Sequence, residues 1–202
     1  MLSFDPKANT ERENYKLLIG TIIPRPIAFV TSKAEDGTIN GAPFSYFNIV
    51  SSKPPMISLA IQRKEGHMKD TARNILRQNE FVVHVVDEAN VEAINLTAAS
   101  LPPDESEIEK ANLTLVSSKK ISVPGIKEAK VRLECRLEHA LELGGDGEIS
   151  TDFIIGRVVH FSIDKDIYDE GKINQSKLLP VSRLAGSSYA KIGETFSLER
   201  PK

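Results

Sequence analysis

Residues 24–61 read PRPIAFVTSKAEDGTINGAPFSYFNIVSSKPPMISLAI, and this stretch contains the pattern that decides the fold. Its first part, Pro26–Ser32, is apolar and rich in β-prone residues, and Asp36-Gly37 supplies a turn before Ile39. Its last part, residues 57–61, alternates as a half-buried strand does. The stretch therefore predicts strands separated by a turn and by a polar loop.

Two further strands are predicted from the middle of the chain. Phe81–Val86 is almost continuously apolar, which is typical of a strand buried on both faces. In Val131–Leu143 the odd positions are apolar except for His139, and the even positions are charged except for Ala140. This alternation predicts one long half-buried strand with Cys135 on its inner face.

Phe153–Ile163 is the last long strand that the sequence predicts. Gly156 within it indicates a β-bulge or the close approach of another part of the chain. Residues 144–147 (GGDG) lie between this strand and the previous one, so they are expected to form the loop of a β-hairpin, with some disorder at its tip.

Helical patterns are fewer and shorter. Asp70 or Thr71 can cap a helix that ends at Asn79 and buries Ala72, Ile75 and Leu76. Asp87 can cap a second helix through Ala99, ended by Pro102-Pro103, with Val91, Ile94 and Ala98 at helical spacing.

The expected fold is mainly β with short helices. At least six strands occur without regular strand–helix alternation, which favours a closed antiparallel barrel over a doubly wound sheet. We expect one domain over residues 1–202, with a core at about 15–165 and a C-terminal segment, 166–202, that packs on the barrel.

The composition narrows the class of protein. Charged residues make up 27% of the 202 residues, the net charge is −2, and Trp is absent, so no nucleic-acid partner is expected. Apolar runs are too short to span a membrane, and the N-terminus lacks the pattern of a signal peptide. The single Cys135 is expected to be a buried apolar side chain, and a cytoplasmic location is the default expectation.

Several common site chemistries have no matching motif. The four histidines, His67, His84, His139 and His160, show no close pairing, and a metal site is not expected. No G-x-S-x-G is present. The glycines near Gly145 lie between two strands, whereas a dinucleotide loop must lead into a helix.

The segment from Asn40 to Ser52 mixes small polar groups with aromatic rings. Its polar side chains are Ser45, Asn48, Ser51 and Ser52, and its rings are Phe44, Tyr46 and Phe47. Such a run can line a planar polar ligand like a flavin, although an ordinary loop explains the composition at least as well.

The following segment, Gln62–Asn74, ends at the predicted start of a helix. Free backbone N–H groups and the helix dipole favour an anion such as phosphate there. Arg63, Lys64, Lys69 and Thr71 are near enough in sequence to assist. A capped helix with solvated lysines is the alternative, and the residues alone favour it.

The order of three motifs resembles one known family. RPIAFVTS, then NGAPFSYFN with SS-x-PP, then KDTARNI are similar to the flavin reductase-like, FMN-binding family. The segments VRLECRL, FIIGRVVHFSID and SRLAGSSYAKIGETFSLERP agree, so the resemblance covers about residues 15–201. It implies a six-stranded Greek-key split barrel that forms a homodimer, with FMN near the subunit interface.

The resemblance also implies the residues that bind the cofactor. They are Thr31, Ser32, Ser45, Phe47, Asn48, Ser51, Arg63, Lys69, Asp70, Thr71 and Asn74. Thr31 and Ser32 are expected beside the flavin ring, Ser51 near the phosphate, and Lys69 and Thr71 on phosphate or ribityl groups. Asp70 can instead be only a helix cap, His84 can be a core histidine, and Tyr189 either covers the pocket or packs the tail.

The leading functional hypothesis is an NAD(P)H-dependent flavin reductase. Hydride would pass from NADH or NADPH to FMN, with no catalytic acid or base required from the protein. Two rivals stay open: a flavoredoxin-like electron-transfer protein that works with a redox-protein partner, and a non-catalytic flavin-binding protein.

Overall fold

A seven-stranded antiparallel sheet forms the body of the molecule in a computed structural model that describes residues 1–98, 106–145 and 147–201. The strand order is β3-β2-β6-β9-β10-β5-β4. The strands are β2 (Ala28–Lys33), β3 (Ile39–Phe44), β4 (Phe47–Ser52), β5 (Pro55–Gln62), β6 (Glu80–Val85), β9 (Val131–Gly145) and β10 (Glu148–Ile163). The two edge strands, β3 and β4, follow each other directly along the chain, which brings the edges of the sheet together.

The remaining elements are short. Three strands form a small sheet in the order β1 (Arg25–Pro26), β13 (Val181–Arg183), β14 (Tyr189–Lys191). Two pairs are β7 (Leu115–Val116) with β8 (Gly125–Ile126), and β11 (Tyr168–Asp169) with β12 (Lys172–Ile173). The helices are α1 (Glu11–Thr21), α2 (Asp70–Gln78), α3 (Val91–Leu96), α4 (Glu107–Lys110), α5 (Gln175–Leu178) and a 3₁₀ turn, η1 (Lys165–Ile167).

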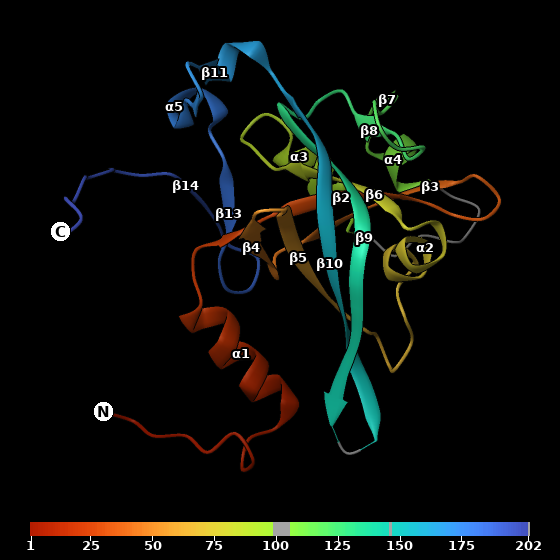
Figure 1. The fold of residues 1–202 in the computed structure, drawn as a ribbon. Helices are drawn as coiled ribbons and strands as arrows, with labels where there is room; N and C mark the ends of the chain where they lie inside the picture. The colour runs from red at the N-terminus through yellow and green to blue at the C-terminus, as the bar shows by residue number, and fades with distance from the viewer. Residues whose placement is uncertain (99–105, 146, 202) are drawn as a thin grey trace.

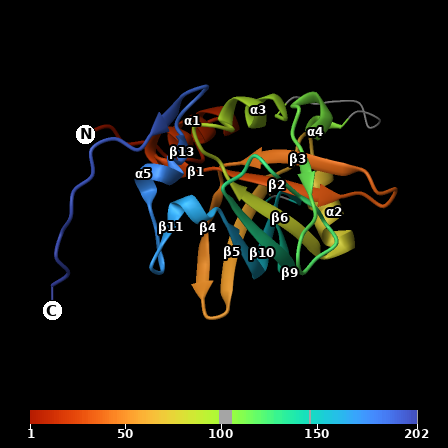
Figure 2. The same ribbon diagram turned by 90° about the horizontal axis from the view of Figure 1, so that it is seen from above.

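The central strands separate two hydrophobic clusters. Val30, Phe81 and Val83 face the interior of the sheet and pack with α2. Phe29 and Val86 face the other way and pack against α3, α4 and β8. Figure 2 shows α3 and α4 on the side of β2 and β3 that faces away from β5 and β10. Both faces of β2 and β6 are therefore covered, which explains why these strands are almost entirely buried.

The predicted close approach at Gly156 is confirmed. The β10 register shifts between Ile155 and Gly156 where it pairs with β9. A Cβ atom at Gly156 would lie 2.3 Å from Cζ of Phe81, so the phenyl ring fills the space that a side chain would need. The glycine leaves room on β10 for the Phe81 ring, which comes from β6 on the other side of β9.

The long β9 strand differs from its prediction in two respects. Glu134 lies on a predicted outer position but is buried, because its carboxylate accepts hydrogen bonds from the backbone N–H groups of Lys119 and Lys120, both at 2.7 Å. From His139 to Gly145 the strand is exposed. Figure 1 shows the reason: the β9–β10 hairpin extends past the body of the sheet, beside α1.

Two details of the predicted helices are wrong. The N-cap residue of α2 is Lys69, which makes no side-chain cap, and Leu76 is exposed. Asp70 pairs with Arg73 one turn further on, and this contact takes its carboxylate away from a capping role. The second helix is α3, which begins four residues after Asp87 and ends at Leu96, so it is shorter than predicted and does not include Ala98; residues 99–103 lie outside the described residues.

Candidate functional site

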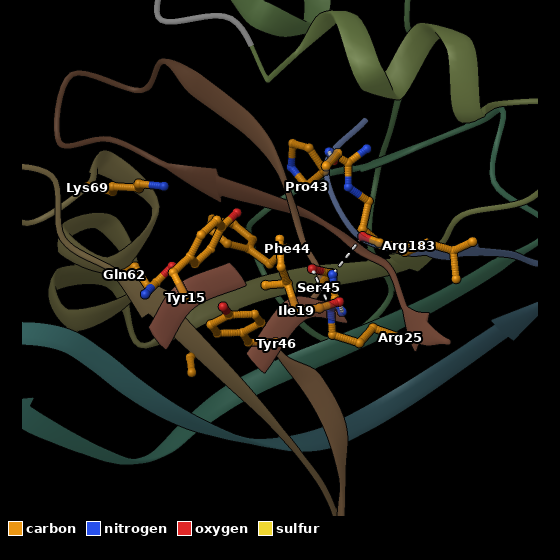
Figure 3. Close-up of a pocket in the computed structure, with 13 residues that line it drawn as sticks. Tyr15, Ile19, Arg25, Pro43, Phe44, Ser45, Tyr46, Gln62, Lys69 and Arg183 are labelled. Carbon is orange, nitrogen blue, oxygen red and sulfur yellow. Dashed lines mark hydrogen bonds between the residues drawn. The ribbon is translucent and has the colours of Figure 1, made fainter. Parts of the chain in front are cut away.

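A hollow of about 130 Å³ lies where six separate segments of the chain meet. It is bounded by α1, by the small β1–β13 sheet with its following turn, by the β3–β4 junction, by the end of β5, and by Lys69 before α2. The principal side chains are Tyr15, Ile19, Arg25, Phe44, Ser45, Tyr46, Gln62, Lys69 and Arg183. Figure 3 shows Lys69 on one side and Arg183 on the other, with the rings of Tyr15 and Phe44 between them.

The charge of this pocket is one-sided. Arg25, Lys69 and Arg183 are its cations, and no acidic side chain belongs to its described lining. None of these three cations forms an ion pair with a carboxylate in the described ranges. Such a cluster repels itself unless an anion is bound, so the pocket is built for a negatively charged group.

Lys69 occupies the end of the pocket nearest α2. Much of its side chain is exposed, but its ammonium lies over the Phe44 ring, 5.9 Å from the centroid. Partial burial is the main cause that lowers the pKa of Lys69, and the nearby Lys64 ammonium adds to it. The first N–H groups of α2 begin next to it without a side-chain cap, and a helix N-terminus favours anions.

Arg25 forms the floor of the opposite end and is only 7% exposed. Its Nη1 group donates to the carbonyl oxygens of Ile19 at 2.8 Å and Ile22 at 2.6 Å, at the C-terminus of α1. Its Nη2 group donates to Leu184 O at 2.9 Å, and Nε donates to Ser45 Oγ at 3.4 Å. Because α1 has no basic residue in its last turn, Arg25 caps that helix and holds it against the pocket.

Aromatic rings and neutral polar groups form the middle of the pocket. Tyr15 comes from α1, and Phe44 and Tyr46 from the β3–β4 junction, with Ser45 between them. Burial raises the pKa of the Tyr46 hydroxyl. Gln62 lies at the end of β5. The pocket thus combines apolar faces with hydrogen-bonding groups, which suits a flat heteroaromatic ligand.

The pocket opens into a larger groove of about 1660 Å³. Tyr15, Ile19, Tyr46, Gln62 and Gly186 line both spaces, so the two are continuous. One wall of the groove is α1 and the other is the turn region of the β9–β10 hairpin. Small-molecule sites usually have volumes of about 300–1,000 Å³, and the two spaces together provide that room.

Two of the residues expected from the family resemblance, Ser45 and Lys69, line the pocket. Four others are buried polar side chains behind it, and three of these, Ser32, Thr71 and Asn74, belong to one hydrogen-bond network beside α2. Ser32 and Thr31 are fully buried, and Asn74 donates to Ser32 Oγ at 3.3 Å. Thr31 Oγ1 donates to Pro124 O at 2.7 Å. Thr71, also buried, donates to Asn40 Oδ1 at 2.8 Å, so this network fixes α2 on β2 and β3.

The other expected residues form ion pairs, hydrogen bonds or apolar contacts with other parts of the chain. Arg63 bridges Asp152 at 2.7 Å and Glu142 at 2.5 Å, and the Asp152 carboxylate is the main cause that raises its pKa. Asp70 pairs with Arg73. Phe47 packs on the inner core, Asn48 Oδ1 accepts from Ile49 N at 2.8 Å, and Ser51 Oγ accepts from Lys53 N at 3.1 Å.

The structure also places three further side chains that the sequence singled out. His84 is fully buried, with Nδ1 2.9 Å from Phe29 O and Nε2 3.0 Å from Ile126 N, so it is a core histidine. Cys135 is buried as predicted, and burial raises the pKa of its thiol. Tyr189 packs beneath Arg183 and donates to Asn95 Oδ1 at 2.8 Å.

The sequence patterns singled out Tyr46 within its segment but did not identify four other pocket residues: Tyr15, Arg25, Gln62 and Arg183. Arg25 and Arg183 stand inside two of the family-like segments, RPIAFVTS and SRLAGSSY. The available signal was one arginine within each of these family-like segments. Only the fold shows that these distant segments meet.

Within residues 1–98, 106–145 and 147–201, no group of three or more His, Cys, Asp or Glu side chains is placed to hold a metal ion. In the same ranges no helix has both the length and the apolar character needed to cross a membrane.

Comparison with known proteins agrees with the resemblance. A family model described as "Flavin reductase like domain" matches residues 19–179. Nitrilotriacetate monooxygenase component B from Bacillus cereus is 57% identical, with a TM-score of 0.96 and 98% of each chain covered. The 2-nitrobenzoate 2-nitroreductase of Pseudomonas fluorescens is 30% identical, with a TM-score of 0.88, covering 99% of this chain and 96% of that one.

A third structure bears on the fold alone. A Shewanella frigidimarina protein described as having a split barrel domain is 19% identical, with a TM-score of 0.85 and 100% of both chains covered. Together with the antiparallel sheet described above, this confirms the predicted split barrel; the main sheet has seven strands where six were expected.

Proposed function

Because this chain belongs to the flavin reductase-like domain family, we propose that it binds FMN and reduces it with NADH or NADPH. Family membership makes the chain a flavin-linked oxidoreductase. The identity of the flavin and the donor are the parts that we propose. The observation that carries the proposal is the pocket itself, in which three cations without an acidic partner flank aromatic rings and neutral polar groups.

The residues of the pocket fit a phosphorylated flavin. Lys69 and the first N–H groups of α2 would hold the phosphate, because both offer positive charge at one place. Tyr15, Phe44 and Tyr46 would contact the faces of the ring, and Ser45 and Gln62 its hydrogen-bonding edges. Ser32, Thr71 and Asn74 would act from behind by fixing α2.

A bound flavin would supply the redox chemistry, as the acceptor of a hydride from the nicotinamide, which would be oxidised. The chain contributes binding and electrostatics. Arg25, Lys69 and Arg183 stabilise negative charge in the pocket. The groove beside α1 leaves access from one side, so a nicotinamide can approach without a dedicated dinucleotide domain. No side chain needs to act as an acid or a base.

We further propose that reduced flavin is passed to a separate monooxygenase component. The support is the Bacillus cereus structure, whose name gives it as component B of a nitrilotriacetate monooxygenase and which is 57% identical to this chain. A component that supplies reduced flavin needs a site from which the flavin can leave. The open groove next to the small pocket supports such exchange.

The decisive experiment begins with the visible absorption spectrum of the purified protein. It continues with steady-state oxidation of NADH and NADPH, each with and without added FMN or FAD. We expect turnover that needs no partner protein and is faster with FMN than with FAD. A yellow protein that is inert to both nucleotides would contradict the reductase and favour the electron-transfer alternative. Faster turnover with FAD would contradict the choice of FMN.

A further inference from the structure

Two arginines stand directly opposite each other in the small sheet. In the β1–β13 pair, the Cα atom of Arg25 is the antiparallel partner of the Cα atom of Arg183. Residues paired in this way project from the same face of a sheet, and like charges so placed are destabilising. Both side chains line the pocket. A compensating anion would remove the repulsion that this register creates.

The Arg25 guanidinium has no such anion within the chain. Its acceptors in the described residues are three backbone carbonyls and the Ser45 hydroxyl, all of them uncharged. These dipoles fix the position of the guanidinium without neutralising it. A buried charge of this kind is costly unless it is paired, so the site is prepared for a ligand that brings negative charge.

Arg183 is also held in place, but with more of its donors free. Its guanidinium lies 4.4 Å from the centroid of the Tyr189 ring, and Nη2 donates to Gly186 O at 2.5 Å. Tyr189 is in turn anchored to Asn95. The Nε and Nη1 groups of Arg183 have no acceptor in the described part of the chain. An arginine fixed in this way presents a planar fork that matches the oxygens of a phosphoryl group.

This arginine pair is separate from the proposed flavin phosphate site. Lys69 lies on the other side of the pocket, beyond Tyr15 and Phe44 (Figure 3). FMN has a single phosphate, which cannot occupy both ends. The second anion must therefore come from another molecule. A pyridine dinucleotide carries several phosphoryl groups, and this chain has no glycine-rich loop before a helix to hold them.

We propose that Arg25 and Arg183 bind a phosphoryl group of the pyridine dinucleotide that donates hydride. The proposal rests on the proposed function and names its second-substrate site. The groove that opens from the pocket beside Gly186 provides room for the remainder of the dinucleotide. The phosphoryl group is either part of the pyrophosphate, which NADH and NADPH share, or the 2′-phosphate, which only NADPH carries.

The test is Arg183→Gln in the FMN-loaded protein. Calorimetric Kd values for NAD⁺ and NADP⁺ and KM values for NADH and NADPH are measured beside the affinities for FMN and riboflavin. Loss of a charged hydrogen-bond partner should weaken nucleotide binding about tenfold or more. An effect on both nucleotides assigns the pyrophosphate, and an effect on NADPH alone assigns the 2′-phosphate. Arg183→Lys should recover part of the affinity.

Lys191→Gln is the matched control. Lys191 lies on β14 of the same sheet but pairs with Glu88 and does not line the pocket. Its loss tests whether any reduction of positive charge has the same effect, and we expect unchanged nucleotide binding. An Arg183→Gln protein with unchanged nucleotide affinity would overturn the proposal. Weakened FMN with unchanged riboflavin would also overturn it, because the pair would then hold the flavin phosphate.

Two further outcomes keep this test independent of folding and of turnover. If the glutamine variant does not fold, inorganic pyrophosphate is titrated against nucleotide and riboflavin on the wild-type protein. Competition with the nucleotide alone supports the proposal, and its absence overturns it. If the wild-type protein binds nucleotides through Arg183 but oxidises neither NADH nor NADPH, the reductase reaction is refuted. The proposed binding site then stands.

Discussion

Lys69 is the side chain on which the proposed choice of a phosphorylated flavin depends most directly. Its ammonium is partly desolvated over Phe44 and stands at the uncapped start of α2. Lys69→Gln should therefore weaken FMN about tenfold or more, since hydrogen bonds to charged groups contribute about 1.5–3 kcal/mol. Riboflavin, which lacks the phosphate, should bind almost unchanged. Titration of flavin fluorescence measures both affinities.

Lys64→Gln is the control for Lys69. Lys64 is close in sequence and exposed but does not line the pocket, so its loss should change FMN affinity little. An equal loss of FMN and riboflavin in Lys69→Gln would show that Lys69 supports the ring or the fold and does not hold the phosphate.

His84 makes the stability of the protein depend on pH. Its Nε2 accepts a hydrogen from the Ile126 N–H, so the folded protein needs the neutral ring, with the Nδ1 proton donated to Phe29 O. Burial lowers the pKa of His84 to about 4. The unfolded chain, with a pKa near 6.5, binds more protons than the folded one between these values. The stabilisation is therefore complete above about pH 6.5 and is lost as the pH falls towards about 4.

The expected loss from His84 is about 2 kcal/mol of unfolding free energy between pH 7 and pH 5. Urea unfolding of the wild type and of His84→Gln at both pH values measures it. Other groups titrate in both proteins, so the difference between their pH dependences isolates His84. NMR titration of the wild-type imidazole is a second measurement. A ring that becomes protonated near pH 6.5 in the folded protein would contradict the prediction.

Among the elements, strands were predicted better than helices because their side-chain pattern is set by burial. β6 was predicted correctly because two separate clusters cover both of its faces. The second half of β9 also alternates, but it lies beyond the body of the sheet. An alternating pattern indicates that one face of a strand is covered. It does not show whether the chain's own core or a partner molecule covers that face.

The helix α1 was missed because its sequence has little apolar pattern. Ile19 is its one buried residue in the structure, so burial left almost no periodic signal. The sequence nevertheless contains a signal for the start of this helix, because Thr10 and Glu13 form a capping box. The position of α1 depends on Arg25, a contact that no local pattern can indicate.

Gly156 allows a direct test of strand packing. Gly156→Ala would place a methyl group 2.3 Å from Cζ of Phe81, which is fully buried and cannot swing into solvent. Overpacking of this kind costs about 1–3 kcal/mol, and we expect a loss of that size in urea unfolding. Gly145→Ala is the matched strand control, because nothing lies within 4 Å of its added Cβ. Equal stability of the two variants would mean that β10 or the Phe81 ring moves to make room for the methyl group without cost.

The candidate site was only partly predictable from the sequence because the whole fold is needed to bring its distant segments together. Ser45 and Lys69 lie in the stretch from which the fold was inferred, and the sequence identified both. Arg183 reaches the pocket from the opposite end of the chain through its pairing with Arg25. Buried polar residues such as Ser32 and Asn74 carry the same residue types as a binding site, and only the structure shows that they hold α2 in place.

The surface of the whole molecule exposes large apolar side chains at several places. They include Leu18 on α1, Ile22 directly after it, Ile49 on β4, Leu141 and Leu143 on the hairpin, and Phe196 and Leu198 near the C-terminus. α1 and the hairpin flank the groove beside the pocket. Apolar surface on this scale marks an interaction site, and the homodimer implied by the family resemblance is the partner that we propose.

Leu141→Glu tests that dimer. Leu141 is 53% exposed in the single chain, so a charge there should change the stability of an isolated protomer by less than about 0.5 kcal/mol. If a second copy covers the hairpin, the same charge is buried without a partner, and the dimer should dissociate. Light scattering after size exclusion measures the mass, with Leu115→Glu as the control because Leu115 is similarly exposed on β7, away from the groove. A wild-type mass of one chain, 22.3 kDa, would contradict the dimer. A dimer that survives Leu141→Glu would place the interface elsewhere on the molecule.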